Sequence, residues 1–229
     1  GPHMTLKTQD IDEAVVQQMD QLEIASDRPL IIADADEVLF QFMASFLEFL
    51  EANKFWFDWS SFALNGNIRH AETDEVVDGR VIRDLMPQFF SKHASNMTPV
   101  ADAAAVLNRL SERAQIVVLS NVPLEAREDR LECLKQNGLD YPLIANKGAK
   151  GPVVKKLAQV TGVPAVFIDD IPHNHKSVAD HADHVLRLHF IAHPRLANLL
   201  EKAEHAHHRA NDWLEMENLI SDHLKASGF

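Results

Sequence analysis

Basic side chains are scarce in this sequence. Its 229 residues include 22 lysines and arginines against 34 aspartates and glutamates, which gives a formal net charge of -12. Affinity for a nucleic-acid backbone comes mainly from basic side chains that neutralise phosphates. The charge therefore disfavours a nucleic-acid duplex as a partner, and the acidic excess by itself is typical of a solubility feature.

Cysteine and long apolar runs are also scarce. Cys133 is the single cysteine, which excludes an intrachain disulfide, and its helix-like surroundings predict a buried, unreactive thiol. Apolar runs of the roughly 20 residues needed to cross a bilayer are absent, and no basic leader precedes an apolar stretch. We therefore expect a cytoplasmic protein without a membrane partner. Residues 1–4 resemble a cloning scar and are expected to take no part in the fold.

Short apolar runs followed by polar residues give the main strand signal. The clearest cover residues 29–33, 115–119 and 165–168, and they end at Asp34, Ser120 and Asp169. Weaker strand patterns cover residues 141–144 and 184–188. Continuous apolar runs of this length are typical of strands buried on both faces of a parallel sheet.

Helix-like segments alternate with these runs. They cover residues 8–25, 101–113, 124–137, 152–161, 195–209 and 211–225. Alternation of strands and helices predicts an α/β fold with a doubly wound parallel sheet.

Residues 40–97 interrupt this alternation and are rich in phenylalanine and tryptophan. We expect them to form a small, mainly helical cap inserted after the first strand of an α/β core, which would comprise residues 5–39 and 98–229 with the C-terminal helices. Aromatic residues at helical spacing more often form a plain core than a ligand platform, but a cap that closes over a polar site would use the same residues.

Asp34 and Asp36 stand two positions apart at the end of the first predicted strand. Side chains alternate along a strand, so both can share a face and converge on one site. Two close carboxylates need a cation or a proton between them, which predicts Mg²⁺ or a shared proton. The alternative is structural, with Asp36 capping the next helix.

Further polar groups follow the later strands. Ser120 and Asn121 offer hydrogen-bond donors suited to phosphoryl oxygens. Lys150 precedes a Gly-Pro helix start, a position suited to anion binding, and we prefer it to Lys147 for that reason. Two consecutive acidic residues at the end of another strand add oxygen ligands for a cation. These are Asp169 and Asp170.

Taken in order, these residues resemble the four motifs of the haloacid dehalogenase-like (HAD) superfamily. The matching segments are Asp34-Ala35-Asp36-Glu37-Val38, Leu119-Ser120-Asn121, Lys150-Gly151-Pro152 and Phe167-Ile168-Asp169-Asp170, and the resemblance spans about residues 29–190. It implies a Rossmann-like core and a Mg²⁺-dependent phosphatase that hydrolyses a small phosphorylated metabolite. Asp36 favours phosphoryl transfer, because the dehalogenases of this superfamily lack the second aspartate of the first motif.

The resemblance also implies a role for each matched residue. Asp34 would be the nucleophile that forms an aspartyl-phosphate, and Asp36 the general acid and base. Ser120 and Asn121 would bind the transferring phosphoryl group, and Lys150 would steady its charge. The Mg²⁺ ligands would be the side chains of Asp34, Asp169 and Asp170 and the backbone carbonyl of Asp36.

The position of the insertion resembles the C1-capped subgroup, with a fainter likeness to its small nucleotidases. Glu37 stands where many members carry glycine, and Asn174 where many carry another acid. Of the 13 histidines, several follow the last motif, but their spacing matches no recurrent zinc module. His173 and Asn174 are expected to be solvated loop residues, although they could also line the mouth of a pocket.

Two other functions fit the same residues. One is a regulatory or protein-binding module that keeps the fold with little or no catalysis, and the other is a phosphotransferase whose acceptor is not water. The natural substrate, the oligomeric state and the role of the histidine-rich C-terminal helices are left open by the sequence.

Overall fold

The computed structural model describes residues 11–229 of the chain. The suspected cloning scar and the first residues of the predicted helix 8–25 lie outside this range.

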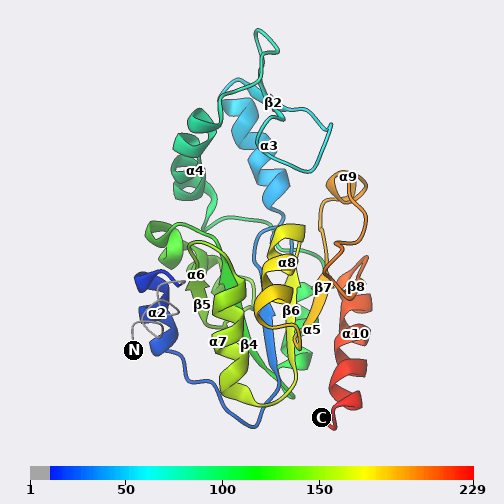
Figure 1. Cartoon of the computed structure of the whole chain (residues 1–229). Helices are drawn as coiled ribbons and strands as arrows, with labels where there is room; N and C mark the ends of the chain where they lie inside the picture. The colour runs from blue at the N-terminus through cyan, green and yellow to red at the C-terminus, as the bar shows by residue number, and fades with distance from the viewer. Residues whose placement is uncertain (1–10) are drawn as a thin grey trace.

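A six-stranded, entirely parallel sheet forms the centre of the molecule (Figure 1), with strand order β5-β4-β1-β6-β7-β8. The strands are β1 (Leu30–Ala33), β4 (Gln115–Ser120), β5 (Leu143–Ala145), β6 (Ala165–Asp169), β7 (Leu186–His189) and β8 (His208–Arg209). β1 lies between β4 and β6, and Ala33 pairs with Val118 on one side and Ile168 on the other. The carboxyl ends of these three strands therefore meet at one edge of the sheet.

Both faces of the sheet are covered by helices, as the buried strand patterns predict. Leu30 and Ile32 pack on one side with α2 (Glu13–Asp20), α7 (Gly151–Thr161) and α8 (Pro172–His181). Ile31 and Ala33 pack on the other side with α5 (Ala103–Leu110), α6 (Arg127–Gln136) and α10 (Trp213–Ala226). A short 3-10 turn, η1 (Leu124–Ala126), precedes α6. The predicted doubly wound α/β fold is confirmed.

Several element boundaries follow local signals. Asp12 caps α2 by accepting a hydrogen bond from the Ala14 N–H, and Asp212 caps α10 through the Glu215 N–H.

Cys133 is buried in α6, and burial raises the pKa of its thiol, in keeping with an unreactive group. Within residues 11–229, no helix combines the length and the apolar character that a membrane span requires.

The predicted helix over residues 195–209 is wrong. The structure has only α9 (Pro194–Ala197), followed by irregular backbone and the short strand β8. β8 extends the sheet at the free edge of β7, and the Arg209 guanidinium donates to the carbonyls of Ala197 and Leu200. Two interactions replace the predicted helix. β8 gains hydrogen bonds by pairing at the sheet edge, and Arg209 donates to carbonyl groups in and after α9.

The insertion, residues 40–97, lies beyond the carboxyl edge of the sheet at the top of Figure 1. It contains α3 (Phe42–Ala52), a two-stranded antiparallel sheet of β2 (Phe55–Phe57) and β3 (Ile68–His70), and α4 (Gly79–His93). Phe89 of α4 contacts the rings of Phe46 and Phe49 of α3 edge to face, with centroids 5.4 Å apart in both pairs. These aromatic residues form the core of the insertion. The exact division into core and cap stays a prediction.

Candidate active site

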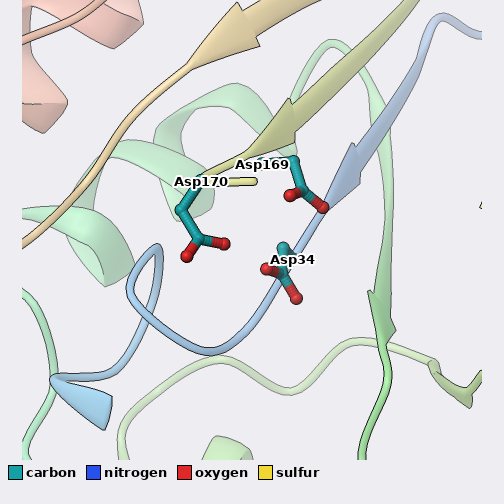
Figure 2. Close-up of side chains that lie close together, drawn as sticks. All are labelled: Asp34, Asp169 and Asp170. Atoms are coloured by element: carbon teal, nitrogen blue, oxygen red, sulfur yellow. The ribbon is translucent and has the colours of Figure 1, made fainter. Parts of the chain in front are cut away.

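Three carboxyl groups converge at the carboxyl edge of the sheet. Asp34 follows β1, Asp169 ends β6 and Asp170 follows it, and each offers an oxygen within 4.8 Å of one from each of the others. Figure 2 shows the three side chains turned towards one another. All three residues are buried. Pairing of β1 with β6 in register creates this cluster from segments 135 positions apart, the interval between Asp34 and Asp169.

Lys150 neutralises part of this negative charge. Its side chain is almost fully buried, and Nζ lies 3.1 Å from Asp34 Oδ1, 2.7 Å from Asp169 Oδ2 and 2.9 Å from the carbonyl oxygen of Leu119. Lys147, the other lysine considered from the sequence, is exposed. The structure therefore brings Lys150 and not Lys147 to the cluster.

Gly151 explains how a buried lysine can stand at the start of α7. Its N–H donates to Ser177 Oγ at 2.9 Å, and a Cβ at this position would collide with the Ser177 backbone carbonyl. Only glycine allows α7 and α8 to approach so closely here. Gly151 is therefore required for the packing of α7 against α8, while Lys150 before it contacts the carboxylates.

The cluster holds more negative charge than its lysine can balance. Burial raises the pKa of Asp34 to about 6, although the Lys150 ammonium opposes that shift. Burial and the carboxylates of Asp34 and Asp169 raise the pKa of Asp170 well above its usual range. Burial alone would lower the pKa of Lys150, but Asp169 and Asp34 outweigh it and raise that pKa. A further proton or a cation at this point would relieve the repulsion among the acids.

Asp169 and Asp170 differ in how their oxygens are used. Asp169 accepts from Lys150 through Oδ2, and from the Ile171 N–H (2.9 Å) and Asn174 Nδ2 (3.0 Å) through Oδ1. Asp170 Oδ1 is buried and has no hydrogen-bond partner among the described residues. Asp170 therefore keeps a free ligand atom, while Asp169 is held in place by three donors.

Asn174 belongs to the site, contrary to the expected solvated loop. It lies in the first turn of α8, lines the pocket and donates to Asp169. The sequence did signal this helix, because Pro172 occupies its first position, where proline is favoured.

Two buried histidines contact the backbone of Asp169 and Asp170. Sequence reasoning missed both roles. His175 Nε2 and His189 Nε2 lie 2.9 Å from the backbone carbonyl oxygens of Asp169 and Asp170, respectively. His189 Nδ1 accepts from the Ala203 N–H, so Nε2 carries the proton and donates to Asp170. Burial lowers the pKa of His189 to about 4, and the ring is therefore neutral near pH 7.

Asp36 lines the same pocket but its carboxylate stands outside the three-acid cluster. Oδ1 accepts from Arg130 Nη2 at 2.8 Å, and the Asp36 side chain keeps 21% of its surface exposed while Arg130 is fully buried. The Arg130 guanidinium also lies over the Phe40 ring, 5.4 Å from its centroid. Arg130 fixes the direction of Asp36, and nothing in the linear sequence signals this pairing across 94 positions.

Ser120 ends β4 and Asn121 follows it. Ser120 is fully buried, and its Oγ has no hydrogen-bond partner within the described part of the chain. Asn121 lines the pocket; its Nδ2 donates to the Gly148 carbonyl, and its Oδ1 accepts from Asn146. Ser120 thus has an unused hydroxyl, whereas the Asn121 amide is already hydrogen-bonded.

Glu37 is a buried carboxyl with a structural task. Its backbone is in the left-handed region (φ 64°), and its two oxygens accept from the N–H groups of Met43 (2.6 Å) and His193 (2.9 Å). Burial raises its pKa to about 7, and the two N–H donors oppose that shift. Glu37 joins the start of α3 in the insertion to the loop that precedes α9.

A cavity of about 300 Å³ opens above the carboxylates and reaches into the insertion. Its lining residues come from the ends of the parallel strands, from α3 and α4, from the segment between β2 and β3, and from α9. Cavities at the carboxyl edge of such sheets are the usual binding sites of doubly wound folds.

Comparison with known proteins identifies the fold. The sequence matches no family model and no curated protein. A haloacid dehalogenase-like protein of unknown function from Agrobacterium tumefaciens superposes with a TM-score of 0.61 at 15% identity, over 85% of this chain and 98% of that chain.

Two further structures give similar superpositions. A HAD family hydrolase from Deinococcus radiodurans, determined with bound phosphate and sodium, has a TM-score of 0.56 at 15% identity over 86% of this chain and 96% of that chain. A putative beta-phosphoglucomutase from Bacteroides vulgatus has a TM-score of 0.53 at 14% identity over 95% of this chain and 98% of that chain. At these identities the likeness establishes the fold, which is that of the HAD superfamily.

Proposed function

We propose that this chain, which has the fold of haloacid dehalogenase-like hydrolases, is a Mg²⁺-dependent phosphatase acting on a small phosphomonoester. One observation carries the proposal. Asp34, a buried carboxylate, lies at the floor of a cavity between the Lys150 ammonium and the free oxygen of Asp170. A nucleophile, a cationic group and a vacant acidic ligand atom are the parts that phosphoryl transfer to a carboxylate needs.

The acidic cluster fits a hard divalent cation. Three buried carboxyl groups share one lysine, and the unpartnered Asp170 Oδ1 supplies the type of oxygen ligand that Mg²⁺ prefers. Asp34 and Asp170 would hold the ion, joined by the Asp36 backbone carbonyl. Asp169 would contribute mainly by orienting Lys150, because its oxygens already accept three hydrogen bonds. The Deinococcus hydrolase was determined with bound phosphate and sodium, which supports the binding of an anion and a cation by a protein of this fold.

Asp34 acts as the nucleophile and Asp36 transfers protons. An oxygen of Asp34 attacks phosphorus while the bond from phosphorus to the ester oxygen breaks, and Asp36 gives that oxygen its proton. Water then attacks the aspartyl-phosphate, Asp36 takes a proton from it, and the bond to Asp34 breaks to release phosphate. Bound Mg²⁺ would supply charge that offsets the repulsion between Asp34 and the phosphoryl oxygens.

Other groups bind and orient the phosphoryl group. Lys150 holds Asp34 and balances charge, and the Ser120 hydroxyl, which is buried just outside the cavity lining without a partner among the described residues, would donate to a phosphoryl oxygen. Arg130 aims Asp36 at the cavity. Burial raises the pKa of Asp34 and the Lys150 ammonium opposes that shift, so a bound cation would further favour the carboxylate form that attacks phosphorus.

Hydrolysis of 4-nitrophenyl phosphate with Mg²⁺ tests the proposal. Asp34→Asn should abolish turnover, with a loss of about 10⁴-fold or more, because the amide cannot act as the nucleophile. Asp222→Asn, an equal change on the exposed surface of α10, is the matched control and should keep full activity. Equal rates for wild type and Asp34→Asn would disprove the proposal.

Transfer to an acceptor other than water is the second candidate. The likeness to a putative beta-phosphoglucomutase favours considering it, since that name denotes phosphoryl transfer between sugar positions. Hydrolysis and transfer share the Asp34 step and differ in what attacks the aspartyl-phosphate. Phosphate release in H₂¹⁸O separates them: one labelled oxygen per phosphate indicates hydrolysis, and a phosphorylated acceptor without free phosphate indicates transfer.

A further inference from the structure

The cavity has a polar end and an apolar end. Its polar and charged lining residues lie mainly at the strand ends or follow them closely: Asp34, Asp36, Glu37, Asn121, Lys150, Asp170 and Asn174. Its apolar lining comes largely from the insertion, with two residues from the core: Phe42, Met43, Phe62, Leu64, Met86, Phe90, Ile171 and Leu196. A phosphoryl group at the polar end therefore directs the rest of the ester towards apolar side chains.

Positive charge is confined to the polar end. Among the described residues that line the cavity, Lys150 is the only cationic side chain. An ammonium group has three N–H donors, and those of Lys150 face Asp34, Asp169 and the Leu119 carbonyl. A second anionic group on a substrate would find no free cation here.

Negative charge near the cavity adds to this effect. The half-buried Asp36 carboxylate lines it, so a substrate carboxylate or second phosphate would meet an acidic neighbour as well as apolar walls. An unpaired charge moved from water into such surroundings loses its hydration without gaining a partner. Arg195 is exposed and lies over the Trp59 ring, 4.6 Å from its centroid, outside the cavity lining.

We propose that the alcohol part of the substrate is compact, apolar and uncharged, such as a phenol or a branched alkyl group. This inference rests on the proposed phosphatase function and names its substrate class. The cavity volume of about 300 Å³ is at the small end of ligand pockets, and the rings of Phe42, Phe62 and Phe90 offer contact surface to such a group. Esters that carry a carboxylate or a second phosphate are excluded by charge.

A matched pair of esters tests the inference with the Mg²⁺-loaded full chain. Phenyl phosphate and 4-carboxyphenyl phosphate share a ring and a leaving-group type and differ by one carboxylate. The para-carboxylate makes the phenolate a slightly better leaving group, so intrinsic reactivity favours the charged ester. We expect kcat/KM to be about 30-fold or more higher for phenyl phosphate, since burying an unpaired charge costs at least a few RT. Equal values, or a preference for the charged ester, would overturn the inference.

A variant pair sharpens the test. Leu64→Arg places a cation in the apolar lining at a half-buried position, and Leu64→Gln is the control for size and polarity without charge. The kcat/KM ratio of the charged to the neutral ester should rise about 10-fold more in Leu64→Arg than in Leu64→Gln, as expected when a buried carboxylate gains a partner. The ratio is insensitive to the fraction of folded protein. An equal ratio in the two variants would contradict the inference.

The two proposals fail in different ways. If neither ester nor any other phosphomonoester is hydrolysed, the phosphatase function falls and the substrate class falls with it. If both esters are hydrolysed through Asp34 at similar rates, the phosphatase function stands and only the substrate class is wrong. A preference for the charged ester that disappears in Arg195→Gln would place the second anion at the rim and also overturn the inference.

Discussion

The two ends of the cavity are built by different kinds of contact. At the sheet edge, polar atoms are fixed by directional bonds from several segments, as when Asp169 accepts from Lys150 just before α7, from Asn174 in α8 and from the Ile171 N–H that follows β6. In the insertion, Phe89 is held by non-directional contacts with the rings of Phe42, Phe46 and Phe49. Directional bonds fix the position of reacting atoms, while aromatic packing defines a shape that tolerates substitution more readily. We therefore expect changes at the sheet edge to affect the rate of the chemical step, and changes in the insertion to affect stability and selectivity.

After Asp34→Asn, removal of the buried cation should give the largest effect on rate. Lys150→Met keeps the length and removes the charge that faces both Asp34 and Asp169. We expect kcat to fall about 10³-fold, because a charge that stabilises the transferring phosphoryl group is lost. Lys147→Met, an equal change at an exposed position three residues away, should leave kcat within about twofold of wild type. Comparable losses in the two variants would remove the assigned role of Lys150.

Truncation in the insertion should instead reduce stability. Phe89 is fully buried, and Phe89→Ala should lower the free energy of unfolding by about 3–5 kcal/mol, as for other large-to-small core changes. Urea denaturation measures the change. Phe229→Ala, at an exposed position, is the control and should cost less than about 0.5 kcal/mol. A loss below about 1 kcal/mol for Phe89→Ala would show that the aromatic cluster does not hold the insertion together.

Replacement of Arg130, which contacts Asp36, should have an intermediate effect on rate. Arg130→Met removes the guanidinium that positions Asp36 while filling much of the same buried space. We expect kcat to fall about 10- to 100-fold with little change in KM, because misplacement of a catalytic group mainly affects the transition state. Arg130→Lys should restore part of kcat. A change confined to KM, or equal losses of folded protein and rate, would indicate a purely structural role.

The smallest effect concerns acid stability. The pKa of His189 is about 4 in the folded chain and about 6.5 in an unfolded one, so the unfolded chain binds more protons between these values and stability falls as the pH drops from 6.5. From about pH 6.5 to 5.5 this contribution should be about 1 kcal/mol, and His189→Gln should lack it. Urea denaturation of the metal-free proteins at both pH values measures the difference. Identical pH dependence would contradict the assigned state of His189. The raised pKa of Glu37 acts with the opposite sign and is common to both proteins.

The residues that the sequence could predict are those signalled by local order. Asp34, Ser120 and Asp169 each stand at the end of an apolar run, and parallel strands bring such positions to one edge. The five predicted strands are all present, but β8 was missed because it is two residues long and exists only through pairing with β7. Its formation depends on an edge that no local pattern reveals.

The supporting residues could not be predicted for a similar reason. Arg130 lies in the middle of a helix-like run, and His175 and His189 resemble many other histidines in the chain. Their roles arise only when the fold places them against Asp36, Asp169 and Asp170. Local pattern thus located the groups proposed to react, while the groups that hold them required the three-dimensional structure.

Glu37 shows how one side chain can join two distant segments while its own backbone is held in an unfavourable conformation. A glycine here would take the left-handed backbone (φ 64°) without strain, and a glutamate takes it at a cost of about 1 kcal/mol. In return its carboxylate ties Met43 to His193. Replacement by glycine would thus relax the main chain and, in the same step, remove the carboxylate that links the start of α3 to the segment before α9, so relief of local strain would come with a looser attachment of the insertion to the core.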